Sequence, residues 1–434
     1  MRISRFIHII SQIELWDAIN KNIIEVEPTL VSFIKENKDN FNIEEYPEIL
    51  LKMGIVVKEE EELERIKKLA EQTTDKQFQS LYLITTTNCN LDCSYCFYRS
   101  SFSGSLKHRQ NMSFEVAKNA IDKFFDIVSK NEITDNYWQQ ITFYGGEPLI
   151  NKELLIQAIP YAREKFNDKF TSLVINTNLV LLDEEIIKMF KDNNVEVQVS
   201  LDGNKEQHDL NRKNIAGQGS YDIVIKNMKL LIENGIKVLP MITATDANIN
   251  NFNETLWKIV EELNIDDYAV NILITNSFET NREYTLTLSK EMLKAYKKFG
   301  KKANDYSFVE LYEMLLGNDK TIAKNSCGCT RKITVFPNGE VYSCQAMEKL
   351  DINKMGNIKT EFINNPNWEL WKKRNKFYNE ECLNCEVVAS CGGGCATGSY
   401  NGTGSIYGID YNQCHYTKNL FKHLLKERTK NSKS

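Results

Sequence analysis

Eleven cysteines are confined to two regions of this 434-residue chain. Three of them, Cys89, Cys93 and Cys96, lie within eight residues, and the next cysteine is Cys327. An odd number of cysteines cannot pair completely into disulfides, so we expect the thiols to hold metal or iron-sulfur clusters. The two cysteine-rich regions bracket a cysteine-free body.

The other eight cysteines lie in the last quarter of the chain. They read C-G-C-x9-G-x4-C and then C-x2-C-x5-C-x3-C-x18-C, at Cys327, Cys329, Cys344, Cys382, Cys385, Cys391, Cys395 and Cys414. Eight thiolates suffice for two sites with four ligands each. By spacing alone, two zinc sites remain an alternative to two iron-sulfur clusters, because C-x2-C pairs are common to both.

The body between these regions alternates β-rich runs with helical apolar spacing. Six such runs are found, at 80–86, 139–145, 172–178, 195–201, 236–244 and 268–275. The alternation predicts parallel strands with crossover helices, in an open doubly wound sheet or a curved partial barrel. In both folds the chemistry lies at the carboxyl ends of the strands.

Residues 1–79 precede this body and show their own pattern of short strands and helices. A strand-like run at 7–10, helical spacing at 27–37 and 43–52, a second run at 54–57 and an acidic helix start at Glu59 indicate a small separate α/β module. We interpret the acidic run as a solvated helix start, since acidic side chains favour the N-terminal end of a helix.

The composition argues against nucleic-acid and membrane partners. Lys and Arg number 54 and Asp and Glu number 59, so the net charge of −5 disfavours a nucleic-acid or other polyanion partner. No apolar run reaches the roughly 18 residues that a membrane span needs, and no signal-peptide core follows the N-terminus. We therefore expect a cytoplasmic protein without a membrane partner.

The first cysteine group has the spacing C-x3-C-x2-C directly after a predicted strand. Three thiolates on one loop can hold three irons of a cubane cluster and leave the fourth iron open. A zinc site would want a fourth protein ligand nearby, and no cysteine or histidine stands close behind Cys96, the nearest histidine being His108. The spacing therefore favours an iron-sulfur cluster.

Cys89, Cys93 and Cys96, with the aromatic Tyr95 before the last cysteine, resemble the signature of radical S-adenosylmethionine (SAM) enzymes. The resemblance implies a [4Fe–4S] cluster whose open iron chelates SAM. It also implies reductive cleavage of SAM to a 5′-deoxyadenosyl radical, which must be kept from water.

Two further motifs at the ends of the predicted strands resemble segments of the same family. In FYGGEPL, the backbone of Gly145 and Gly146 together with Glu147 would contact the SAM amino group. In VSLDGNKEQHDLNR, Ser200 and Arg212 would contact the ribose and the carboxylate of SAM, whereas the Asp-Gly pair between them is typical of a turn.

The stretch NTNLV after the third strand resembles a third family segment. Its Asn178 would also contact SAM, and Leu179 stands where the family usually has glycine.

The C-terminal cysteines resemble the SPASM extension of radical SAM enzymes over about residues 325–420. By this resemblance one auxiliary [4Fe–4S] cluster is held by Cys327, Cys329, Cys344 and Cys395, and another by Cys382, Cys385, Cys391 and Cys414. The tight C-x-C pair leaves open whether one of its two cysteines is free, which would leave an auxiliary iron open. The expected cofactors are three [4Fe–4S] clusters and SAM.

The resemblance implies an α/β fold with three domains. We expect a leader-peptide recognition module of winged-helix type at 1–79, a partial (β/α)6 barrel of the TIM-like radical SAM type at 80–310, and a SPASM domain with a C-terminal helix at 311–434. The N-terminal module could alternatively be a packing cap on the barrel.

The expected function is that of a peptide maturase. The enzyme would crosslink a ribosomally made precursor peptide, by a thioether of the sactipeptide or ranthipeptide type or by a carbon–carbon or ether bond. Its partners would be the precursor, captured by its leader, and a reductant such as flavodoxin or ferredoxin. Alternatives are an anaerobic sulfatase-maturing enzyme, a peptide epimerase, carrier-peptide amine chemistry, and a non-catalytic zinc-stabilised binding protein.

Overall fold

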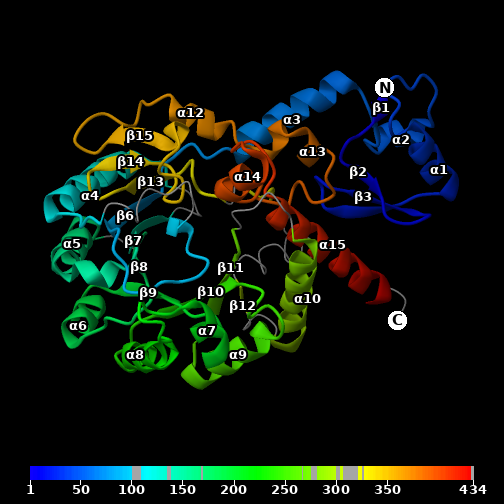
Figure 1. Cartoon of the computed structure of the whole chain (residues 1–434). Helices are drawn as coiled ribbons and strands as arrows, with labels where there is room; N and C mark the ends of the chain where they lie inside the picture. Colours follow the sequence, from blue (N-terminus) through cyan, green and yellow to red (C-terminus); the bar gives the residue numbers. More distant parts are fainter. Residues whose placement is uncertain are drawn as a thin grey trace.

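A sheet of ten strands runs through the computed structural model of the chain (Figure 1). The structure describes residues 1–99, 109–133, 138–167, 170–265, 267–274, 281–299, 304–305, 321–324 and 327–431. No helix in these ranges is long and apolar enough to cross a membrane.

Six strands of this sheet are parallel and follow one another in chain order. They are β6 (Ser80–Thr86), β7 (Gln139–Gly145), β8 (Thr171–Thr177), β9 (Val195–Ser200), β10 (Val238–Ala244) and β11 (Asp267–Ile272). A doubly wound sheet would reverse its strand order at a switch point, and these strands do not. The prediction of an α/β fold with six alternating strands is therefore confirmed, and the winding is that of a partial barrel.

Helices cover the outer face of this curved sheet (Figure 1). They are α4 (Phe114–Val128), α5 (Lys152–Lys165), α6 (Glu184–Asp192), α7 (Lys205–Asn211), α8 (Tyr221–Glu233), α9 (Phe252–Leu263) and α10 (Arg282–Phe299). Helix α4 shows why they form: the Ser113 hydroxyl accepts a hydrogen bond from the Val116 amide, and apolar side chains at helical spacing, such as Ala117, Ala120 and Phe124, are buried in the core.

The sheet continues beyond the barrel at both edges. Strand β13 (Lys332–Val335) pairs parallel with β6, and β14 (Glu340–Tyr342) and β15 (Lys354–Asn357) extend it antiparallel. At the other edge β12 (Asn304–Asp305) pairs with β11. This continuation was not predicted.

Short helices and the 21-residue helix α15 complete the C-terminal region. They are η5 (Asp351–Asn353), α12 (Asn367–Lys372), η6 (Lys376–Tyr378), α13 (Glu380–Leu383), α14 (Ala396–Thr403) and α15 (Tyr411–Asn431). The proposed boundary at 310/311 lies outside the described residues.

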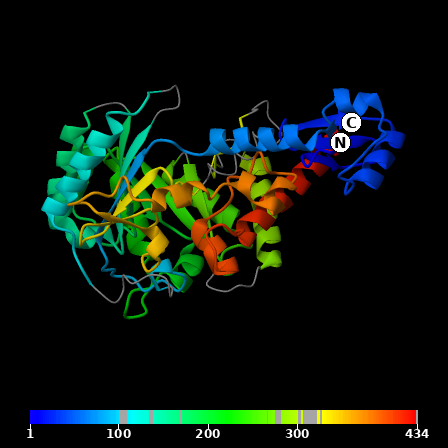
Figure 2. The same ribbon diagram turned by 90° about the horizontal axis from the view of Figure 1, so that it is seen from above.

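The N-terminal residues form a small unit with its own hydrophobic cluster. It contains the pair β1 (Arg2–Ile3) and β5 (Val56–Val57), the antiparallel sheet of β2 (Ile7–Ile9), β3 (Glu14–Asp17) and β4 (Asn22–Glu25), and helices α1 (Pro28–Asn37), α2 (Glu48–Lys52) and α3 (Glu59–Thr73). The unit lies at one end of the molecule, beside helix α15 (Figures 1 and 2).

Specific contacts attach this unit to the C-terminal region. The Trp16 indole N–H donates to the Glu386 carbonyl at 2.7 Å, the Lys21 ammonium donates to the Thr321 carbonyl at 2.6 Å, and the Asn375 amide donates to the Ala70 carbonyl at 3.1 Å. The N-terminal unit is thus packed against three separate segments of the C-terminal region.

Candidate functional site

The three-cysteine loop leaves the carboxyl end of β6 and is held by its neighbours on both sides. The Gly146 amide donates to the Thr86 carbonyl at 2.9 Å, and the Glu147 amide donates to the Asn88 carbonyl at 2.8 Å. On the other side the Asp92 amide donates to the Lys213 carbonyl at 2.7 Å. The loop is therefore fastened to the ends of β7 and α7.

Two glycines at the end of β7 make the close approach to this loop possible. A Cβ at Gly145 would lie 2.3 Å from the Thr86 carbonyl oxygen, and one at Gly146 would lie 2.2 Å from the Asn88 carbonyl oxygen. Real side chains do not tolerate such distances to backbone atoms. The glycines were predicted to approach SAM, and the structure shows that they also seat the cysteine loop.

The Glu147 carboxylate is buried and accepts three hydrogen bonds from the protein. The donors are the Thr177 hydroxyl at 2.6 Å, the Asn178 amide at 2.7 Å and the Leu149 amide at 3.0 Å. Burial raises the pKa of Glu147 to about 7, against the lowering effect of these donors. The side chain therefore joins the ends of β7 and β8, while the predicted contact with the SAM amino group stays a prediction.

The end of β8 reaches the cysteine loop as well. The Asn178 side-chain amide donates to Asn90 Oδ1 at 2.8 Å and lies 3.9 Å from Cys89 Sγ. Leu179 has a φ of 59° and is fully buried, so the glycine position of the family is filled by a left-handed leucine whose apolar side chain lies in the core.

Asp202 is buried and hydrogen bonds to several residues around the cysteine loop. The sequence pattern predicts only a turn at this position. The Asp202 carboxylate accepts from Arg212 Nε at 2.8 Å, from Arg212 Nη2 at 3.2 Å, from the Thr243 amide at 3.0 Å and from the Tyr95 hydroxyl. The Arg212 guanidinium also lies 5.3 Å from the centroid of the Tyr95 ring. Asp202 thereby fixes Tyr95, which stands between two of the three cysteines.

One cavity of about 1070 Å³ opens at the carboxyl ends of the strands. Every residue predicted for the first cluster and for SAM lines it, namely Cys89, Cys93, Cys96, Tyr95, Gly145, Gly146, Glu147, Asn178, Ser200 and Arg212. The cavity is also lined by Cys327, Cys329, Cys344, Cys391 and Cys395 from the C-terminal region. Cysteines from both cysteine-rich regions of the sequence thus line the same cavity.

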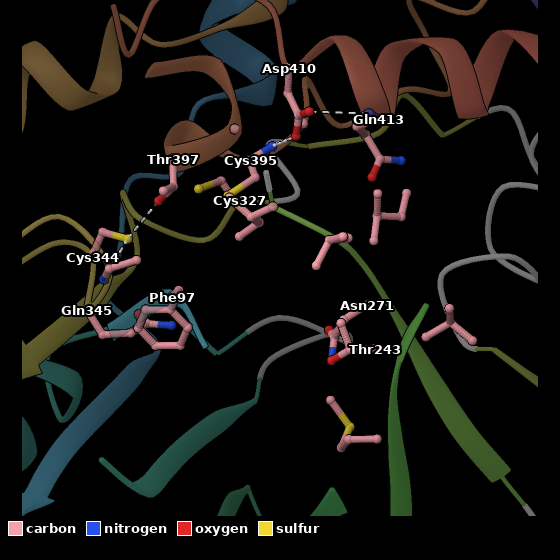
Figure 3. A pocket seen from close by; sticks show the side chains of 18 of the residues that line it. Phe97, Thr243, Asn271, Cys327, Cys344, Gln345, Cys395, Thr397, Asp410 and Gln413 are labelled. Carbon is pink, nitrogen blue, oxygen red and sulfur yellow. Dashed lines mark hydrogen bonds between the residues drawn. The ribbon is translucent and has the colours of Figure 1, made fainter. Parts of the chain in front are cut away.

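The structure brings together the four cysteines assigned to the first auxiliary site. The sulfurs of Cys327 and Cys329 lie 3.1 Å apart, the Cys327 thiol also contacts Cys395, and the Cys329 thiol contacts Cys344. Figure 3 shows Cys327, Cys344 and Cys395 around the cavity. Both cysteines of the C-x-C pair therefore belong to this group.

The other four cysteines form a second group. Burial raises the pKa of Cys382 and of Cys414 to about 12, and neighbouring thiols add to the rise: those of Cys385 and Cys391 for Cys382, and those of Cys382 and Cys391 for Cys414. The eight cysteines thus lie in two groups, and the assignment of one auxiliary cluster to each group stays a prediction.

Lysines lie near both cysteine groups, which suits the binding of anionic clusters. Burial lowers the pKa of Lys332, Lys376 and Lys418, and nearby thiols act in the opposite direction. The net result is a raised pKa for Lys332, near the first group, and for Lys418, near the second, whereas the pKa of Lys376 falls to about 8. The described residues include no carboxylate within ion-pair distance of these three ammonium groups. Within the same residues, no group of three or more metal-binding side chains surrounds the position of a single metal ion. The thiolates of a cluster would supply the missing negative charge.

Comparisons with known proteins agree with this geometry. Residues 83–263 match the model of the radical SAM superfamily. The chain is 23% identical over 368 residues to the radical SAM cyclopropyl synthase TigE of Paramaledivibacter caminithermalis, covering 82% of this chain and 76% of that protein. The chain is a radical SAM enzyme.

Two more relatives bear on the remainder of the chain. A cysteine-type anaerobic sulfatase-maturating enzyme of Clostridium perfringens is 27% identical over 367 residues, which cover 94% of that protein and 78% of this chain. The structure of Streptococcus suis SuiB bound to precursor peptide SuiA superposes with a TM-score of 0.55 at 16% identity, over 95% of this chain and 99% of that one. This likeness shows that the two chains share a fold over nearly their whole length.

The cofactors of this radical SAM enzyme are a [4Fe–4S] cluster and SAM. The identification also removes the alternative of a non-catalytic zinc-stabilised binding protein.

Proposed function

We propose that this radical SAM enzyme installs an intramolecular crosslink in a ribosomally made precursor peptide. The observation that carries the proposal is the single cavity lined by both the three-cysteine loop and the first C-terminal cysteine group. A site that starts a radical and a site that could accept an electron are thereby open to the same substrate. A thioether is the favoured bond, with carbon–carbon or ether bonds as further possibilities.

In this proposal the residues keep their predicted roles. Cys89, Cys93 and Cys96 hold the SAM-binding cluster, and the two C-terminal groups of four cysteines hold two auxiliary clusters. When bound, the first cluster and SAM supply a radical able to remove a hydrogen atom from an unactivated carbon. The protein fixes the cluster loop through Gly146 and through the contact of Asp202 with Tyr95.

The peptide would lose one hydrogen atom to the SAM fragment and one proton to solvent for each crosslink. One electron leaves the peptide as the new bond forms, and the auxiliary clusters are its proposed acceptor. A flavodoxin or ferredoxin would supply the electron that starts the next cycle.

The expected product of this chemistry is a peptide lighter by two hydrogen atoms per crosslink. The reconstituted enzyme, dithionite, SAM and a precursor encoded by an adjacent reading frame are incubated without oxygen, and 5′-deoxyadenosine and peptide mass are measured. The same peptide incubated with the Cys89→Ala enzyme is the control. Cofactor cleavage with unchanged peptide mass would instead indicate epimerisation, and an aldehyde at a single cysteine or serine would indicate sulfatase maturation.

The sulfatase-maturing alternative is disfavoured by the N-terminal unit. The C. perfringens enzyme is matched over nearly its whole length while about a fifth of this chain is left over. SuiB, which is described with its precursor peptide, covers this chain almost completely. An additional unit beside the barrel is therefore consistent with the capture of a longer peptide.

The free edge of β4 is the proposed leader-binding edge of this unit. Strand β4 pairs only with β3 among the described strands, whereas the outer edge of β2 is approached by the Lys38 ammonium, which donates to the Ile7 carbonyl. An extended leader would add to β4 as a further strand and gain main-chain hydrogen bonds with little demand on its sequence.

The pairing register shows which amides face the leader. The Val26 amide donates to the Ile13 carbonyl, and hydrogen-bonded pairs alternate along an antiparallel ladder, so the Ile23 and Glu25 amides point away from β3. Glu25 is exposed, which makes it the better position for a test.

The substitution Glu25→Pro is expected to weaken leader binding about five-fold or more, because it removes one outward N–H, worth about 1 kcal/mol. Fluorescence anisotropy with a labelled leader measures the Kd. Glu25→Ala removes the side chain but keeps the N–H, so it should bind as the unchanged protein does. Equal affinities of the proline and alanine variants would rule out docking at this edge.

A further inference from the structure

A buried lysine with no carboxylate partner stands in the wall of the cavity. Lys332 begins β13, beside Ser80 of β6, and is 8% exposed. Its ammonium donates to Gln345 Oε1 at 2.8 Å and lies 4.7 Å from the centroid of the Tyr82 ring. Both partners are neutral, so the positive charge is held in place without being neutralised.

The other described cations of the cavity wall have acidic partners. Arg212 pairs with Asp202 at 2.8 Å, and Arg331 and Lys324 approach Asp75 at 3.8 and 3.9 Å. Lys332 therefore differs from its neighbours.

The two described acids of the cavity wall are also engaged elsewhere. Glu147 accepts its three protein donors, and Asp410 accepts from the Cys395 amide at 2.9 Å and the Gln413 amide at 3.2 Å. Neither is within ion-pair distance of Lys332.

The cysteines of the first auxiliary group line the same cavity as Lys332 and would be its negative partners once they hold a cluster as thiolates. Burial lowers the pKa of Lys332, but Cys329, Cys344 and Tyr82 raise it above its usual value. Gln345, which orients the ammonium, directly follows Cys344 in the chain, and it lies beside the cavity in Figure 3. The hydrogen bond to Gln345 thus holds the charge in a fixed position beside the segment that carries Cys344.

We propose that Lys332 is the counter-charge of the first auxiliary cluster and raises its reduction potential. The inference rests on the proposed function, because it requires a cluster at these cysteines. A cubane with four thiolates is an anion, and reduction by one electron adds a further negative charge that a fixed neighbouring cation stabilises. Lys332 would thereby make the cluster a better acceptor for the electron that leaves the peptide.

The test is a redox titration in which electron paramagnetic resonance measures the reduced clusters. It is done in protein carrying Cys89→Ala, Cys93→Ala and Cys96→Ala, so that only auxiliary iron contributes. Lys332→Met should move the midpoint of one cluster to a more negative potential. The expected change is about ten-fold in the electron-transfer equilibrium constant, or about 59 mV for one electron.

Two variants control for effects other than charge. Lys332→Arg keeps the charge and should stay near the parent potential. Lys324→Met removes another cation from the same cavity wall. The Lys324 side chain is 60% exposed and approaches Asp75, so its charge is screened and its loss should leave the potential unchanged. If Lys332→Met loses iron, Lys332→Gln, which can still hydrogen bond, replaces it in the titration.

The outcomes separate the inference from the proposed function. A triple-cysteine variant without bound iron would refute the auxiliary clusters, and the inference with them. Bound iron with an unmoved potential in both neutral variants would refute the inference alone. An unmoved potential, together with a raised KM for the precursor when Lys332→Met is made in enzyme that keeps Cys89, Cys93 and Cys96, would show that Lys332 binds a carboxylate of the substrate, which also overturns the proposed role.

Discussion

Replacing Gly146 by alanine is expected to reduce SAM cleavage at least about 100-fold, although residue 146 carries no functional side chain. The new Cβ would lie 2.2 Å from the Asn88 carbonyl oxygen, 2.6 Å from its carbon and 3.2 Å from the Cys89 amide nitrogen. These are backbone atoms and cannot rotate away. The loop must shift together with Cys89, and displacements of about 1 Å at a reacting centre cost about two orders of magnitude in rate.

The measurement is 5′-deoxyadenosine formation under dithionite, with iron content in parallel. Cys89→Ala sets the level expected when a cluster ligand is missing. Gly402→Ala in α14 is the matched control, because its Cβ would meet its neighbours only at 3.7 Å or more. A Gly146→Ala protein that cleaves SAM as fast as the Gly402→Ala protein would show that the close approach of β7 is dispensable.

The barrel strands could be predicted because each is a short apolar run with a turn or a helix on either side. Parallel strands are buried on both faces, so β6 reads as a continuous run in which Leu81, Leu83 and Ile84 are fully buried. The order of the strands within the sheet could not be predicted from such local patterns. It emerged only from the pairing, which excludes the doubly wound alternative.

The continuation of the sheet through β13 had no local signal. Lys332 pairs with Ser80 although about 250 residues separate them in the chain. The four-residue strand reads like many hairpin strands, and its parallel partner is set by tertiary packing. Nothing in the spacing of the C-terminal cysteines indicates that their region is built onto the barrel sheet.

The role of Asp202 was missed for a different reason. An Asp-Gly pair after a strand is typical of a turn, and this one does precede the turn into α7. Its side chain nevertheless bonds Tyr95, which is 107 residues away. The sequence motifs predict that Tyr95 and Arg212 belong to the site, but the acid that joins them is recognisable only once both lie beside it.

The substitution Asp202→Ala is expected to lower the free energy of unfolding by about 3–5 kcal/mol, because it leaves a buried arginine without its partner. The Arg212 side chain is 9% exposed, so water cannot replace the lost carboxylate. Tyr95 also loses its acceptor, and the cysteine loop is expected to hold iron less well. Urea unfolding and iron content measure the two effects, and Glu196→Ala, which breaks the more exposed pair with Lys237, should cost at most about 1 kcal/mol.

A second substitution distinguishes the unpaired charge from loss of the site as a whole. If the cost arises mainly from the isolated guanidinium, then Asp202→Ala combined with Arg212→Met removes both charges and should recover part of the lost stability. SAM cleavage should not recover, because Tyr95 remains unsupported and the predicted contact of Arg212 with SAM is gone. Equal stability of the single and double variants would place the cost in packing around Thr243 and Tyr95 rather than in the ion pair.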